Sequence, residues 1–169
     1  MRKRFVFFRL AGGRYCIPVE QVLQILRLEG LIEIPKPPPY VEGVLNLRGD
    51  IIPVVNLRAR LELPGHADSA TAPTSGGGAP SRVFADPRKR RVVIVRVGTK
   101  PYGLDVDEVR EIIEIEDGAV TSDGTTMFGV RADFLLGIAR QEDGVYMVLD
   151  LPRVVGASRD LPGAVAGTA

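Results

Sequence analysis

The stretch that decides the fold runs from Val41 to Leu57 and reads VEGVLNLRGDIIPVVNL. Two apolar runs rich in β-branched side chains flank the Gly49-Asp50 step, where a glycine can supply the positive φ of a tight reversal between paired strands. The pattern predicts a β-hairpin that turns at this step. Arg48 lies at the predicted turn, and a charged side chain there serves either solvation or contact with a partner. The hairpin sequence by itself leaves both interpretations open.

Short elements are expected on both sides of this hairpin. Phe5–Leu10 reads as a mostly buried strand, and Tyr15 begins a second strand after a glycine turn. The proline-rich residues 35–40 favour a rigid connector over a polyproline ligand. Residues 57–61 predict one helical turn after the hairpin.

A short helix is expected where Val19 and Val22 recur at helical spacing. It covers residues 19–25, and residues 25–34 are expected to return to strand. Such a short helix depends on packing for its stability.

The second half of the chain repeats the first. The segments 5–10 and 15–22 reappear 87 positions later, and residues 43–57 reappear as 137–151, 94 positions later. Every connection is too short for the crossover helices of a parallel sheet. The repeat therefore predicts an all-β fold with short helices, made of two small barrels.

The repeat and the composition together divide the chain. Residues 1–64 are expected to form one barrel subdomain and residues 82–155 the other. Residues 65–81, rich in Gly, Ala, Ser, Thr and Pro, are expected to be a flexible linker, and the small residues of 156–169 a disordered tail. Whether strands are exchanged between the barrels stays open.

Charge and hydropathy exclude several classes of function. The chain has 169 residues, with 22 basic and 21 acidic ones and a net charge of +1, so no strong field points to nucleic acid or an anionic membrane. No apolar run approaches the roughly 20 residues of a membrane helix, and the run after the basic N-terminus breaks at Arg9. We expect a cytoplasmic protein, in which the single cysteine, Cys16, is a buried apolar residue.

Enzyme chemistry finds little support in these residues. The only histidine, His66, lies in the predicted linker with no fixed partner. The carboxylates around Asp105 and Glu111 are expected to cap and solvate a second short helix. We therefore predict no catalytic, cofactor or metal site. A small-molecule pocket in an enzyme accessory barrel has no residue in its favour.

The basic run Arg88–Arg91 offers an alternative function, binding of single-stranded nucleic acid. Such binding normally uses exposed aromatic side chains for stacking, whereas most Phe and Tyr here lie in apolar strands and Trp is absent. The run is better explained as the solvated start of the strand at 92–97.

The run 43–58, GVLNLRGDIIPVVNLR, strongly resembles the signature of the CheW family of bacterial chemotaxis adaptors. The resemblance extends from Phe5 to about Val155 and is interrupted mainly by residues 65–80. It implies two SH3-like five-stranded barrels, in agreement with the repeat. It also implies a non-enzymatic scaffold in which one surface binds the regulatory domain of a CheA-type histidine kinase and another binds the cytoplasmic hairpin tip of a chemoreceptor. The resemblance implies that the protein associates with the inner membrane only indirectly, by recruitment to receptor arrays. It implies no binding of nucleic acid.

The resemblance further implies which residues contact partners. They are Val22, Gln24, Gly43, Arg48, Val109, Ile112 and Gly137. The hypothesis is an apolar groove near Val22, Gly43 and the hairpin, with Arg48 at its rim, that accepts receptor helices. At the repeat position of Arg48 stands Glu142, so the shared architecture does not require arginine there, which favours a partner.

Two positions depart from the family pattern. Many members carry a glutamate able to pair with the motif arginine where this chain has Gln24. A neutral amide can hydrogen-bond a guanidinium but forms no charge-assisted bidentate pair, which implies a face tuned for a different receptor. Asn56 stands where aspartate is common, a change expected to be structural.

Overall fold

A computed structural model describes residues 2–37, 40–63, 88–122 and 132–156. The predicted linker, His66 within it, and all of the predicted tail except Gly156 lie outside these residues. Within the described part of the chain, no helix is long and apolar enough to cross a membrane.

The fold consists mainly of short strands, so the prediction of an all-β protein with short helices is confirmed. The strands are β1 (Arg2–Leu10), β2 (Gly13–Pro18), β3 (Val22–Arg27), β4 (Val41–Leu47), β5 (Asp50–Asn56), β6 (Arg91–Val97), β7 (Lys100–Val106), β8 (Glu108–Glu116), β9 (Val120–Thr121), β10 (Leu135–Gln141) and β11 (Gly144–Leu149). The helices are η1 (Val19–Gln21), α1 (Leu57–Arg60), η2 (Asp117–Ala119), η4 (Ala132–Phe134) and α2 (Leu151–Val154).

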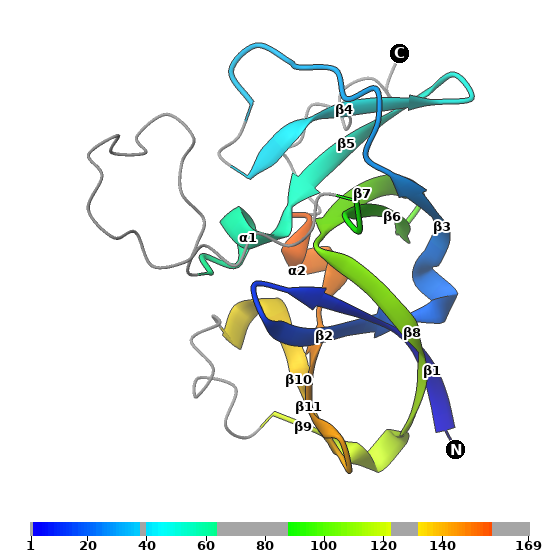
Figure 1. The fold of residues 1–169 in the computed structure, drawn as a ribbon, viewed down its shortest axis with the longest axis vertical. Helices are drawn as coiled ribbons and strands as arrows, with labels where there is room; N and C mark the ends of the chain where they lie inside the picture. Colours follow the sequence, from blue (N-terminus) through cyan, green and yellow to red (C-terminus); the bar gives the residue numbers. More distant parts are fainter. Residues whose placement is uncertain (1, 38–39, 64–87, 123–131, 157–169) are drawn as a thin grey trace.

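The strands form two sheets, and each sheet takes strands from both halves of the chain (Figure 1). One, here called the six-stranded barrel, has the order β8-β1-β2-β11-β10-β9, in which β9 contributes only two residues. The other, the five-stranded barrel, has the order β3-β6-β7-β5-β4. The expected subdomains 1–64 and 82–155 therefore do not each form a barrel of their own. Strands are exchanged between the barrels, as the sequence had left open.

Alternating side chains fill three apolar cores. In β1, Phe5 and Phe7 point into the six-stranded barrel, whereas Val6, Phe8 and Leu10 join a larger core shared by the two barrels. Strand β6 alternates in the same way, so that its even-numbered Val92 and Ile94 point into the five-stranded barrel and its odd-numbered valines into the shared core. Burial on both faces explains why these strands read as continuous apolar runs.

Arg60 of α1 joins the two barrels at their helices. Its guanidinium donates to the carbonyl oxygens of Val154 (2.8 Å) and Arg153 (3.0 Å) at the end of α2. It also lies over the rings of Tyr40 (4.1 Å to the centroid) and Phe134 (4.9 Å). Cations suit a helix C-terminus and an aromatic face, so one side chain holds elements from both halves together.

Two predicted helices differ from the structure, since the first is present only as the short η1 and the second is absent. The first ends at Gln21, because Val22–Arg27 instead pairs with β6 as a strand. Residues 28–34 form no strand, and only Ile32 makes an isolated bridge to Val44. The second, expected around Asp105 and Glu111, is replaced by the end of β7 and by β8, which pairs with β1. In both places a long ladder satisfies more backbone groups than one helical turn could.

Candidate functional site

The predicted hairpin is present as β4 and β5, but its turn lies one residue earlier than expected. Arg48 (φ 54°) and Gly49 (φ 89°) are the two central residues, and Asp50 already pairs with Leu47. The Asn46 side chain accepts a hydrogen bond from the Gly49 amide at 3.0 Å. Positive φ at both positions is typical of a tight hairpin turn and is uncommon for arginine. The local backbone therefore does not favour Arg48, and its side chain needs another explanation.

The Arg48 side chain is exposed and makes no hydrogen bond or ion pair with any described residue. Beside it lies a groove of about 640 Å³, lined by the turn residues, by Leu23 of β3 and Ile51 of β5, and by residues 99–102. Arg96 also lines this groove. Its lining combines apolar side chains with the charged Arg96, Lys100 and Asp50, which suits an amphipathic partner.

Large apolar side chains are exposed on two of the edge strands, one in each sheet. Leu23 (46% exposed) and Ile25 (40%) lie on β3, and Ile112 (57%) lies on β8. Val22 and Val109, at the beginnings of the same strands, pack against the shared core. In Figure 1 the two strands and the β4–β5 turn lie on one side of the molecule. We call this side the edge-strand face. Its strands and turn carry five of the seven predicted contact residues: Val22, Gln24, Arg48, Val109 and Ile112.

Gly43 and Gly137 occupy equivalent bulges in β4 and β10, and both are buried. A Cβ on Gly43 would lie 2.4 Å from the Ile32 carbonyl oxygen, and one on Gly137 would lie 2.6 Å from that of Thr121. Each glycine thus lets a covering segment cross its strand closely. Packing accounts for both residues, so they support the site from beneath.

Gln24 lies on β3 opposite Ile94 and is half-buried. No hydrogen bond joins it to Arg48 in the described structure. The amide thus leaves the turn arginine available.

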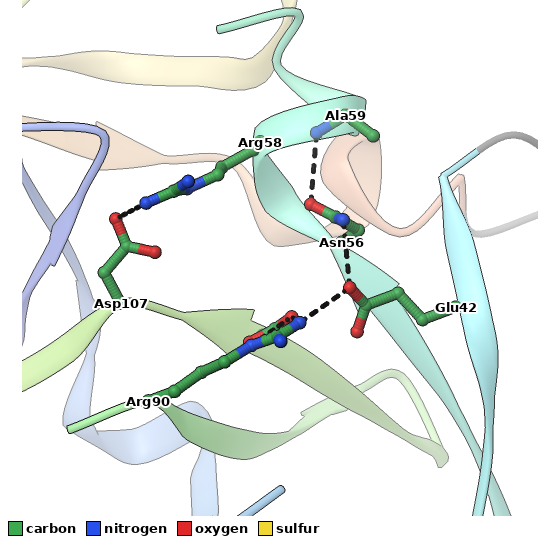
Figure 2. Close-up of polar contacts among 7 residues, drawn as sticks. Glu42, Asn56, Arg58, Ala59, Arg90 and Asp107 are labelled. Atoms are coloured by element: carbon green, nitrogen blue, oxygen red, sulfur yellow. Dashed lines mark hydrogen bonds and ion pairs between the residues drawn. The ribbon is translucent and has the colours of Figure 1, made fainter. Parts of the chain in front are cut away.

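A polar cluster lies behind the hairpin, where β4, the start of α1 and the segment before β6 meet (Figure 2). Glu42 Oε1 accepts from Asn56 Nδ2 at 2.9 Å and from Arg90 Nη2 at 2.8 Å. Arg90 Nε also donates to both carboxylate oxygens of Asp105, at 2.7 and 3.0 Å. Asn56 caps α1, since its Oδ1 accepts from the Ala59 amide. An aspartate at 56 would lack the amide donor that Glu42 requires, which gives this substitution its structural reason.

A second ion pair adjoins the cluster. Arg58 of α1 binds the Asp107 carboxylate, which also accepts from the Ala11 amide at 2.8 Å. Because Ala11 belongs to the β1–β2 turn, Asp107 connects the two barrels. Among the described residues, no group of three or more His, Cys, Asp or Glu is arranged to hold a metal ion.

The basic run 88–91 is largely engaged within the protein. Arg90 serves the cluster, Arg91 donates to the carbonyl oxygens of Arg88 and Arg90, and Lys89 lies 3.8 Å from Glu108. Carboxylates thus pair with Lys89 and Arg90, and the structure does not favour nucleic-acid binding through this run.

Sequence reasoning missed the groove residues Leu23, Ile51 and Arg96, because apolar strand residues were assigned to the core. A signal was available in β3. Its sequence, Val22–Arg27, carries Val22, Leu23, Ile25 and Leu26, more apolar residues than one buried face of a six-residue strand needs. An edge strand with an exposed apolar face indicates a contact surface.

Comparisons with known proteins give a consistent result over most of the chain. A family profile described as CheW-like domain matches residues 4–159. The Chemotaxis protein CheW of Treponema pallidum is 28% identical over 151 residues, which cover 89% of this chain and 81% of that protein. The Chemotaxis protein CheW of Bacillus subtilis is 28% identical over 156 residues, covering 90% and 86%.

A solved structure agrees with these matches. The crystal structure of scaffolding protein TtCheW from Thermoanaerobacter tengcongensis matches with a TM-score of 0.72 and 27% identity, covering 89% of this chain and 86% of that one. This likeness confirms the prediction of two SH3-like barrels.

Proposed function

The chain belongs to the CheW-like domain family, and from this premise we propose that it is a non-enzymatic adaptor which couples a chemoreceptor to a CheA-type histidine kinase. Relatives named chemotaxis proteins and a solved relative titled scaffolding protein support this class of function. The role places the chain in the cytoplasm, recruited to receptor arrays at the inner membrane.

The observation that carries the proposal is the exposed apolar surface of two edge strands beside an unpaired arginine. A receptor tip is a helical hairpin, and a helix binds through an apolar stripe. The edge-strand face exposes Ile112 on β8 and Leu23 and Ile25 on β3, apolar side chains that such a helix can cover. Arg48 lies at the turn beside these side chains and can orient the helices by a charged hydrogen bond.

The groove at the end of the five-stranded barrel is the proposed kinase contact. Ile51 is 46% exposed there, beside Pro53, Pro101 and the basic Arg96. An adaptor must hold two partners at once, and the groove is lined by the β4–β5 and β6–β7 turns and by no residue of β8. Arg48 lies where the two surfaces meet.

Separate binding measurements with an isolated receptor tip and an isolated kinase regulatory domain test this assignment. Ile112→Asp is expected to weaken receptor binding at least tenfold and to leave kinase binding unchanged, whereas Ile51→Asp is expected to do the reverse. Leu136→Asp is the matched control, because Leu136 is equally exposed (53%) but lies on β10, outside both surfaces.

The assignment would be contradicted if Leu136→Asp lost binding to both partners. It would also be contradicted if Ile112→Asp and Ile51→Asp both bound the two partners normally. Binding of neither partner by the unmodified protein would reject the proposed function itself.

A further inference from the structure

The cluster behind the hairpin has more carboxylates than cations. Arg90 is shared between Glu42 and Asp105, and the Asp105 side chain is only 6% exposed. The neighbouring Arg58–Asp107 pair is already matched in charge, and Asn56 is neutral. Lys89 and Arg110 both pair with the more distant Glu108 and do not contact this cluster. One buried carboxylate charge is therefore left without its own cation, an arrangement that favours proton uptake.

Glu42 is the carboxylate with the poorer set of partners. Asp105 receives two bonds from Arg90 Nε and a further one from Nη2, whereas Glu42 has only Oε1 bonded. Glu42 Oε2 is buried and has no hydrogen-bond partner among the described residues. A proton on this carboxyl removes the negative charge from an oxygen that no donor stabilises.

We propose that Glu42 holds a proton at neutral pH, and that its loss toward mildly alkaline pH loosens β4 from β7 and α1. Two carboxylates beside one guanidinium repel each other, so the one with fewer hydrogen bonds, Glu42, favours its neutral form. Burial and the adjacent Asp105 raise the pKa of Glu42 to about 8, against the opposing effects of Arg90 and Asn56.

Strand β4 is placed so that this proton matters. It edges the five-stranded sheet, with β5 on one side and the single Ile32–Val44 bridge on the other. The Glu42 side chain is a further attachment, to Arg90 and to the cap of α1 (Figure 2). Because β4 leads into the Arg48 turn, protonation of Glu42 is expected to decrease the mobility of that turn. This device concerns the fold and does not depend on the proposed function.

The pH range follows from the sign of the shift. A carboxyl whose pKa is raised in the folded state contributes stability that is fully present below its unfolded pKa of about 4.5 and is lost as pH rises to about 8. The attachment of β4 through Glu42 to Arg90 and Asn56 is therefore strongest in mild acid and weakest at pH 8 and above.

A carbon-13 NMR titration of the glutamate side-chain carboxyls in the full chain tests the proton on Glu42 directly. One glutamate resonance is expected to titrate between pH 7 and 9, and to be missing in Glu42→Gln. That variant keeps the acceptor for Asn56 and Arg90 and adds an amide donor for Asp105, so it is expected to fold. If every glutamate carboxyl titrates below pH 6, the proposal is overturned.

Hydrogen exchange of the β4 amides tests the loosening. After correction for the intrinsic rate, protection of residues 41–47 in the unmodified protein is expected to fall about tenfold or more between pH 6 and pH 8. In Glu42→Gln it is expected to stay level. Glu114→Gln removes an exposed carboxylate that faces Arg2 and is expected to behave as the unmodified protein. Parallel pH profiles for all three proteins would overturn the proposal.

Discussion

The two hairpins β4–β5 and β10–β11 have the same bulged architecture but different chemistry behind it. At the bulge, Glu42 in the five-stranded barrel corresponds to Leu136 in the six-stranded one. Likewise Arg90 and Asp105 correspond to Lys3 and Pro18 in the repeat. Glu42, Arg90 and Asp105 fill their site with ion pairs. Leu136, Lys3 and Pro18 instead line a pocket of about 210 Å³. The shared fold thus accepts either solution, and the polar one is particular to the hairpin with Arg48.

At the turns the situation is reversed, because the β10–β11 turn has polar contacts and the β4–β5 turn has none from Arg48 to the described residues. In the β10–β11 turn, Asp143 is bound by Arg14 and accepts from the Tyr146 hydroxyl. In the β4–β5 turn, Arg48 has a positive φ and no partner among the described residues. A hairpin that is tied firmly at its base and left unpaired at its tip is suited to contact another molecule.

Substitution of the bulge glycines is expected to have the largest effect, and an equal one in both hairpins. Gly43→Ala and Gly137→Ala each force a covering backbone to move, which costs about 3 kcal/mol of unfolding free energy. Urea unfolding measures this loss. A Gly43→Ala protein of unchanged stability that fails to bind a receptor would instead make Gly43 a direct contact residue.

Removal of the equivalent cations, Arg90 and Lys3, is expected to destabilise the protein by different amounts at the two hairpins. Arg90→Ala leaves Asp105 buried without its partner and is expected to cost about 2–3 kcal/mol, less than a fully buried pair because Arg90 is partly exposed. Lys3→Ala removes only a surface pair 3.5 Å from Asp117 and is expected to cost less than about 0.5 kcal/mol. Equal losses in thermal or urea unfolding would show that the two sites are not chemically distinct.

Substitution of Glu42 is expected to give a smaller change in the free energy of unfolding, and one that depends on pH. Because the raised pKa of Glu42 opposes folding above the unfolded value, Glu42→Gln is expected to stabilise the protein by about 1–2 kcal/mol at pH 8, given about 1.4 kcal/mol per pKa unit and partial loss elsewhere in the cluster. At pH 4.5 the gain is expected to vanish. Leu136→Met, at the equivalent position, is expected to show no such pH dependence in the same unfolding series, and a matching pH dependence there would contradict the account.

The sequence predicted the strands and the repeat well, because apolar alternation and turn residues are local signals. It misplaced helices at 19–25 and around Asp105, where pairing with β6 and β1 decides the conformation. Such long-range pairing leaves no local signature. The same holds for the exchange of strands between barrels, since two similar repeats can close on themselves or on each other.

The candidate site was predicted in part. The motif located Arg48, and the repeat showed that the fold does not require it, but neither placed Leu23 and Ile51 at the surface beside it. Exposure depends on which strands end at a sheet edge, and that is known only from the topology. Gly43 and Gly137 show the converse case, because their packing role became visible only with the covering segments in place.

The most direct test of the central claim compares the two turns in one binding experiment. Arg48→Ala and Glu142→Ala change equivalent exposed turn residues, and both are expected to leave the unfolding free energy within about 0.5 kcal/mol of the unmodified protein. Titration with an isolated receptor tip is expected to show at least a tenfold weaker Kd for Arg48→Ala and an unchanged Kd for Glu142→Ala. Equal affinities for the two variants, with the fold intact, would contradict the claim that the β4–β5 turn is the partner-facing one.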